Sequence, residues 1–119
     1  MYGNTTVKQW DLVILEINFS DYERSKLRPA VVVSNNKYNG VFDDVVVVGI
    51  YSKIMGRDFS TLITNDDLKE GFLVKKSTLK VDSIFKVEKD LIYKKIGVLK
   101  EEKTDEIKTL LCELFEIKC

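Results

Sequence analysis

The stretch DVVVVGIY, residues 44–51, decides the fold class of this chain. Its four consecutive valines favour an extended backbone, because β-branched side chains pack well on a pleated surface. A second Val-rich run covers residues 30–34, and the asparagines and glycine within residues 35–40 separate the two runs. Asparagine and glycine are typical of turns. The sequence therefore predicts two β-strands, at 30–34 and 44–51, bounded by turns.

Shorter strands are predicted on both sides of these runs. Residues 13, 15, 17 and 19 are apolar, which gives a strand at 12–19 one apolar face. Further short strands are predicted at 59–63, 72–75, 78–81 and 84–87. Such closely spaced strands in a small chain favour a curved antiparallel barrel over a sandwich.

The last segment has a different period. The apolar residues from Ile107 to Phe115 recur at the spacing of one helix face. Acidic residues within 101–106 stand in the first turns, where negative charge suits the helix dipole. We therefore expect one domain, 1–119, that is mainly β and carries a C-terminal amphipathic helix.

The charge balance and the missing histidine narrow the chemistry. The 119 residues carry 19 Lys+Arg, 19 Asp+Glu and no histidine, so the formal net charge is zero. Without histidine, His-dependent catalytic triads and His-ligated zinc are excluded. Zero net charge argues against coating nucleic acid by bulk charge and leaves room for a local basic cleft. We expect neither a metal nor another cofactor.

The ends of the chain indicate a compartment. Residues 1–8 lack the apolar core of a signal peptide, and the longest aliphatic run, 45–48, is too short to span a bilayer. A continuous helix would hold Cys112 and Cys119 about 10 Å apart, beyond the reach of a disulfide. The sequence therefore predicts a soluble, cytoplasmic protein with two reduced thiols and no membrane contact.

A cationic segment joins the first two strands. In ERSKLRPA, residues 23–30, the cations Arg24, Lys26 and Arg28 alternate with other residues. Pro29 suits the first residue of a strand, and a guanidinium beside it is well placed for a bidentate phosphate contact. An ordinary solvated loop explains the same residues.

At this point the sequence resembles a known family, the PemK/MazF toxins of bacterial toxin–antitoxin modules. The similarity begins with DLV at 11–13, RPAVVVS at 28–34 and VGIYS at 48–52. It continues in STLKVDSIFKV at 77–87 and IGVL at 96–99, so its ordered pieces cover most of the chain.

The resemblance implies a dimeric SH3-like barrel that cleaves single-stranded RNA without a metal and is neutralised by a cognate antitoxin. It places the catalytic pair on Arg28 and Ser52. The family's upstream glutamate falls on Glu23, and its late carboxylate, with a basic residue two positions before it, falls on Asp82 and Lys80.

The chemistry of RNA cleavage suits these residue types. The 2′-hydroxyl attacks phosphorus and the 5′-oxygen leaves, which requires a base, a cation for the phosphate and a proton donor. Arg28 can bind two phosphate oxygens and Ser52 a third. An arginine has a pKa above about 12, so we favour Glu23 or Asp82 as the base.

Other side chains are candidates for tracking RNA. These are Tyr22, Arg24, Lys26, Lys53, Arg57, Lys75, Lys76 and Lys80. Structural roles explain some of the same residues: Ser52 as a turn residue, Asp82 as a strand-edge charge, and the lysines as a solvated strand face.

The chain departs from the usual family pattern at Trp10 and at Ser83. The usual Gly-Asp opening is Trp10-Asp11 here, which is expected to change how the first strand begins, and the frequent Gln after the late carboxylate is Ser83.

Two alternative functions stay open. One is a protein-binding barrel of the gyrase-poisoning type, although its C-terminal Trp is missing from residues 115–119. The other is a relative that has lost cleavage and serves regulation.

Overall fold

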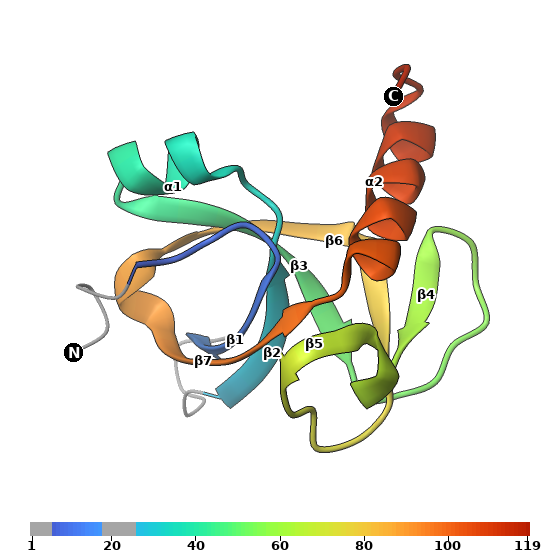
Figure 1. The fold of residues 1–119 in the computed structure, drawn as a ribbon, viewed down its shortest axis with the longest axis horizontal. Helices are drawn as coiled ribbons and strands as arrows, with labels where there is room; N and C mark the ends of the chain where they lie inside the picture. The colour runs from blue at the N-terminus through green and yellow to red at the C-terminus, as the bar shows by residue number, and fades with distance from the viewer. Residues whose placement is uncertain (1–5, 18–25) are drawn as a thin grey trace.

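The computed structural model describes residues 6–17 and 26–119 and shows one curled antiparallel sheet with a helix at its end (Figure 1). Seven strands lie in the order β4-β6-β3-β2-β1-β7-β5. The strands are β1 (Asp11–Ile17), β2 (Lys26–Val32), β3 (Asp44–Tyr51), β4 (Ser60–Ile63), β5 (Leu68–Gly71), β6 (Ser77–Glu88) and β7 (Ile92–Leu99). The helices are α1 (Asn36–Val41) and α2 (Glu101–Phe115), and two single 3₁₀ turns are η1 (Asn65–Asp67) and η2 (Lys89–Leu91). The predicted fold class, mainly β with a C-terminal helix, is confirmed, and the barrel takes the form of a curled half-barrel.

Most strand predictions are confirmed, with differences at their ends. Strand β3 has the predicted bounds, and the separate strands predicted at 78–81 and 84–87 are one strand, β6. Helix α1 was not predicted, because its asparagines read as turn formers. The side chain of Asn35 instead accepts a hydrogen bond from the Tyr38 N–H and caps that helix.

The strand predicted at 72–75 is wrong, and β5 lies just before it. The carboxamide of Asn65 replaces a neighbouring strand at this point. It accepts from the Leu73 N–H at 2.6 Å and donates to the Leu73 carbonyl at 2.9 Å. Since a side chain satisfies both backbone groups, no strand partner is needed.

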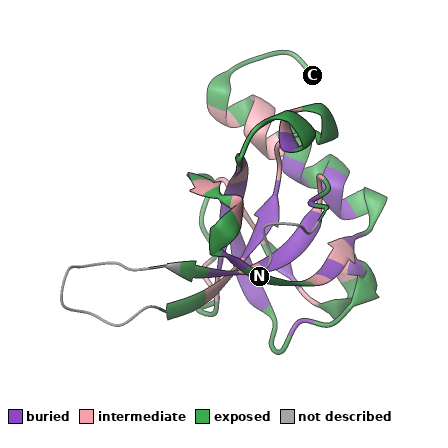
Figure 2. Cartoon of the chain, turned by 90° about the vertical axis from the view of Figure 1, so that its left-hand side faces the viewer, coloured by how far each residue is buried: buried purple, intermediate pink, exposed green. Residues whose placement is uncertain are grey.

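Both faces of the central strands are buried, which explains the valine run. Leu12, Val48 and Ile50 belong to one core cluster, which Ile107 of α2 completes. Their neighbours along the strands point to the other face, and Val13 and Val47 among them belong to a second core cluster. Figure 2 shows this burial through the middle of the sheet, with exposed residues on α2 and the loops.

A long strand, β6, pairs with both β3 and β4, and its register against β3 shifts in the middle. Val48 pairs with Ile84, whereas the next residue, Gly49, pairs with Lys80. Residues 81–83 are therefore surplus on β6, as in a β-bulge with more than one extra residue. This bulge bends the sheet and offers Asp82 and Ser83 outside the regular ladder.

Trp10, at the position where glycine was expected from the resemblance, directly precedes β1. Trp10 has a φ of 75°, in the left-handed region that glycine favours, and β1 begins directly after it. Asp11 is buried and its carboxylate accepts from the Lys8 N–H at 2.9 Å. Burial raises the pKa of Asp11, against the opposing influence of that hydrogen bond and of Lys95. Strand β1 therefore begins directly after a residue whose backbone is strained.

The C-terminal end corrects the prediction of two separate thiols. Helix α2 ends at Phe115, Glu116 adopts a left-handed φ of 56°, and the Ile117 N–H donates to the Cys112 carbonyl. The chain turns back, and Cys112 and Cys119 are joined as a disulfide with their Cα atoms 6.2 Å apart. The prediction failed because it continued the helix to residue 119.

In the described part of the chain, no helix has the length and apolar character needed to cross a membrane.

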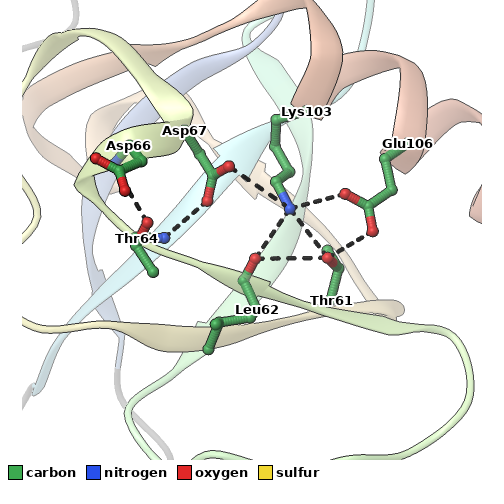
Figure 3. Close-up of polar contacts among 7 residues, drawn as sticks. All are labelled: Thr61, Leu62, Thr64, Asp66, Asp67, Lys103 and Glu106. Atoms are coloured by element: carbon green, nitrogen blue, oxygen red, sulfur yellow. Dashed lines mark hydrogen bonds and ion pairs between the residues drawn. The ribbon is translucent and has the colours of Figure 1, made fainter.

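A buried lysine fastens α2 to the sheet (Figure 3). The side chain of Lys103 is only 8% exposed. Its ammonium donates to Thr61 Oγ1 at 3.0 Å, the Leu62 carbonyl at 2.9 Å and Glu106 Oε1 at 2.8 Å, and lies 3.8 Å from Asp67 Oδ1. Burial by itself raises the pKa of Glu106, but hydrogen bonds from Lys103 and Thr61 and the charge of Lys103 outweigh it and lower that pKa overall.

The Glu106 contacts predict a pH-dependent stability. Because the pKa of Glu106 is lower in the folded chain, its contribution is present above the ordinary value of 4.5 and is lost as pH falls through the folded value. We expect Glu106→Gln to lower the free energy of unfolding at pH 7 and to match the parent near pH 2. Urea unfolding across this range measures the difference. Glu113→Gln, an exposed change at the end of the same helix, should show no such pH-dependent loss, and an equal loss there would contradict the assignment.

Gly71 is predicted to be essential for the β5–β7 edge. Its φ is 95°, and an added Cβ would lie 2.1 Å from the Ile96 carbonyl oxygen and 2.3 Å from Gly97 Cα. We expect Gly71→Ala to lower the free energy of unfolding by about 2 kcal/mol or more, measured by urea unfolding. Gly40→Ala is the matched control, because a Cβ at this position of α1 meets nothing within 4 Å. That change should be neutral or stabilising, and equal losses in both variants would contradict the steric argument.

Candidate active site

Arg28 stands on β2 in the wall between two cavities. It pairs with Leu15 of β1, next to Pro29, and is half-buried. Two positions beyond the Ala30–Gly49 pair of β2 and β3 lie Arg28 and Tyr51. Arg28 and Tyr51 therefore lie on the same face of the sheet, on adjacent strands.

The smaller cavity, of about 260 Å³, brings together the catalytic pair implied by the resemblance. Its polar lining comes from Arg28, Ser52, Lys75 and Ser77. Ser52 is exposed just after β3, whereas Ser77 is buried at the start of β6. Two cations and the Ser52 hydroxyl around one space can bind a phosphate, whose oxygens accept hydrogen bonds from them, whereas the Ser77 hydroxyl already donates to the Lys75 carbonyl at 3.0 Å.

The larger cavity, of about 600 Å³, is also lined by Arg28. Its walls are mostly apolar, from Leu15 and Pro29 to Ile84 and Phe85. The polar side chains in its lining are Arg28, Glu16, Tyr51 and Lys86. A mostly apolar cavity of this size with a few polar groups is typical of a ligand site.

Tyr51 is held in place in the wall of the larger cavity. Its hydroxyl and Ser83 Oγ share a hydrogen bond of 2.5 Å, and Lys80 Nζ lies 4.8 Å from the centre of its ring. The absence of a side chain at Gly49 makes this possible, since a Cβ there would lie 2.9 Å from Tyr51 Cε1 and 3.0 Å from its hydroxyl. The bulge in β6 supplies Ser83.

The late carboxylate, Asp82, is paired. Its Oδ2 accepts from the guanidinium of Arg57 at 2.7 Å, and the two side chains are 31% and 45% exposed. Asp82 lines neither of the cavities beside Arg28. In the described structure, these cavities and the Asp82–Arg57 ion pair are therefore separate groups of residues.

The remaining sequence candidates divide into three groups. Lys75 is in the smaller cavity and Lys80 is against Tyr51, as given above. Lys26, Lys53 and Lys76 are exposed, at the start of β2, in the loop after β3 and before β6. The candidates Tyr22, Glu23 and Arg24 lie outside the described residues.

Five residues of these groups were not singled out from the sequence as site candidates: Glu16, Tyr51, Ser77, Ser83 and Lys86. The spacing of Gly49 and Tyr51 is a usable signal, since residues two apart share a strand face and glycine leaves room above it. Ser83 and Ser77 gave no comparable signal, because their positions depend on the bulge and on the loop before β6. Among the described residues, no group of three or more Asp, Glu, His or Cys side chains could hold a metal.

The family described as "PemK-like, MazF-like toxin of type II toxin-antitoxin system" matches residues 8–115. The chain belongs to this family. No curated protein matches it significantly.

Solved structures share the fold. A MazE–MazF structure from Deinococcus radiodurans is 20% identical, with a TM-score of 0.79, and the match covers 97% of this chain and 100% of that one. An endoribonuclease with its cognate antitoxin from a mycobacterial species is 17% identical, with a TM-score of 0.77, over 95% and 98% of the two chains. The Mycobacterium tuberculosis toxin MazF-mt6 is 15% identical, with a TM-score of 0.74, over 92% and 99%.

Proposed function

We propose that this chain is an endoribonuclease toxin that cleaves single-stranded RNA without a metal ion. The observation that carries the proposal is the shared cavity of Arg28, Ser52, Lys75 and Ser77. Family membership supports the same reading, and structures of similar fold include proteins named as endoribonucleases.

The residues of the smaller cavity suit the phosphate at which RNA is cleaved, because the charge on that phosphate increases during the reaction. As the 2′-oxygen bonds to phosphorus and the 5′-oxygen departs, negative charge grows on the non-bridging oxygens. Arg28 stabilises that charge with two parallel N–H donors, and Ser52 donates to a further oxygen. The 2′-hydroxyl proton passes to a base, and a proton donor supplies the leaving 5′-oxygen. The products are a 2′,3′-cyclic phosphate and a 5′-hydroxyl.

The proposal includes two protein partners. A second copy of the chain forms a homodimer, and a cognate antitoxin neutralises the toxin. Structures of similar fold have been solved with an antitoxin, described as MazE in the Deinococcus case, which supports the second partner. An acidic antitoxin segment can compete with RNA for the cations near Arg28.

Substituting Arg28 tests the mechanism. Incubated in EDTA with a long single-stranded RNA, the parent should cut at discrete sites and leave cyclic phosphate ends. Arg28→Ala should lower the cleavage rate at least about 100-fold, because it removes charge stabilisation from the transition state. Lys37→Ala, an exposed cation on α1, is the control and should keep the parent rate. Absence of cutting by the parent, or equal cutting by Arg28→Ala, would overturn the proposal.

The base is tested with three carboxylates. Glu23 and Asp82 are predicted from the sequence and the resemblance, and Glu16 lines the larger cavity with Arg28. We expect one of Glu23→Gln, Asp82→Asn and Glu16→Gln to lower the cleavage rate by about 100-fold or more. Arg57→Ala separates loss of a base from loss of the Asp82–Arg57 ion pair, since it removes the pair and keeps the carboxylate. Full activity of all three carboxylate variants would show that the base is another group.

A further inference from the structure

Tyr51 occupies a fixed position that the cleavage mechanism does not use. Its ring lies over Gly49, its hydroxyl bonds to Ser83, and the Lys80 ammonium stands against the ring. Three constraints on one side chain leave it little rotamer freedom. The Tyr51 side chain therefore loses little conformational entropy when a ligand binds against it. Preorganised side chains of this kind serve recognition.

The polar groups around Tyr51 are rich in donors. Each hydroxyl carries one O–H, and the Tyr51–Ser83 bond consumes one of the two. One O–H is left for a ligand. The ammonium of Lys80 lies against the ring and adds N–H donors and positive charge, although among these residues only Tyr51 itself lines the larger cavity. This array favours a ligand atom that accepts hydrogen bonds, such as a carbonyl oxygen.

The larger cavity suits a flat apolar ring beside a phosphate. Its volume of about 600 Å³ exceeds the space of one nucleobase, and Phe85 and Ile84 contribute apolar wall. Arg28 lines this cavity and also the smaller one, which holds Ser52. A nucleotide whose phosphate meets Arg28 can therefore place its base against Tyr51.

We propose that Tyr51, positioned by Ser83 and Lys80, is a specificity-determining residue that binds a carbonyl-bearing base (uracil, guanine or cytosine) in the larger cavity. The inference rests on the proposed function in taking RNA as the ligand. Adenine is disfavoured, because it presents no carbonyl oxygen to the donors around Tyr51.

The test measures binding without cleavage. The probes are fluorescein-labelled nine-residue oligodeoxynucleotides, which lack the 2′-hydroxyl nucleophile: one of dA throughout, and two in which the central residue is dU or dG. Fluorescence anisotropy gives Kd for each. We expect the parent to bind the dU and dG probes about tenfold more tightly than the all-dA probe.

Two variants should abolish this preference. Tyr51→Phe keeps the ring and removes its hydroxyl, and Ser83→Ala removes the partner of that hydroxyl; each should bring the Kd ratio close to 1. Tyr38→Phe is the matched control, since it removes a tyrosine hydroxyl bonded to Asp44 at 2.6 Å on α1 and should keep the parent ratio. Urea unfolding confirms that each variant is folded.

The outcomes separate this inference from the proposed function. Equal binding of all three probes by the parent, or an unchanged ratio in both Tyr51→Phe and Ser83→Ala, would overturn the role of Tyr51. A base preference that depends on Tyr51, in a parent that does not cut RNA, would leave this inference standing and remove the proposed activity.

Discussion

The register shift between β3 and β6 is the constraint on which the site depends. A regular ladder would keep residues 81–83 in the sheet, but the pairing passes from Val48–Ile84 to Gly49–Lys80 and leaves them out. One consequence is a bend in β6, which curves the sheet. The other is chemical, since Ser83 reaches Tyr51 and Asp82 reaches Arg57. The bend of the sheet and the polar surroundings of the cavities therefore have one cause.

The elements that the sequence predicted well are those whose own residues decide their conformation. The valines of β3 and the apolar stripe of α2 are such cases. The elements it missed depend on a partner far away in the chain or on a cap. Asn65 supplies both hydrogen bonds to Leu73 where a strand was expected, and the Asn35 side chain converts a turn-like run into α1. The separation predicted for Cys112 and Cys119 failed at Glu116, where one left-handed residue reverses the chain.

For the site, the sequence and the family resemblance supplied Arg28 and Ser52, and the structure gathers both at one cavity. Their catalytic roles stay predictions, as do those of Glu23 and Asp82. The spacing of Gly49 and Tyr51 was a signal for Tyr51, but its contact with Ser83 could not be predicted, because that contact depends on the bulge in β6. Stability and recognition are also separated in space. The buried Lys103 network fastens α2 to β4 and η1, and its residues line neither cavity beside Arg28.

The missing side chain at Gly49 couples two positions of the chain to each other. With Tyr51 in its present place, even one added methyl group at residue 49 would overlap the ring, so the two residues share a single volume. Relatives should therefore vary at these positions together: a long aromatic residue at 51 accompanies glycine at 49, and a larger residue at 49 accompanies a short one at 51. Residues 49 and 51 would then change together during evolution, because a protein with only one of the two substitutions would be less stable.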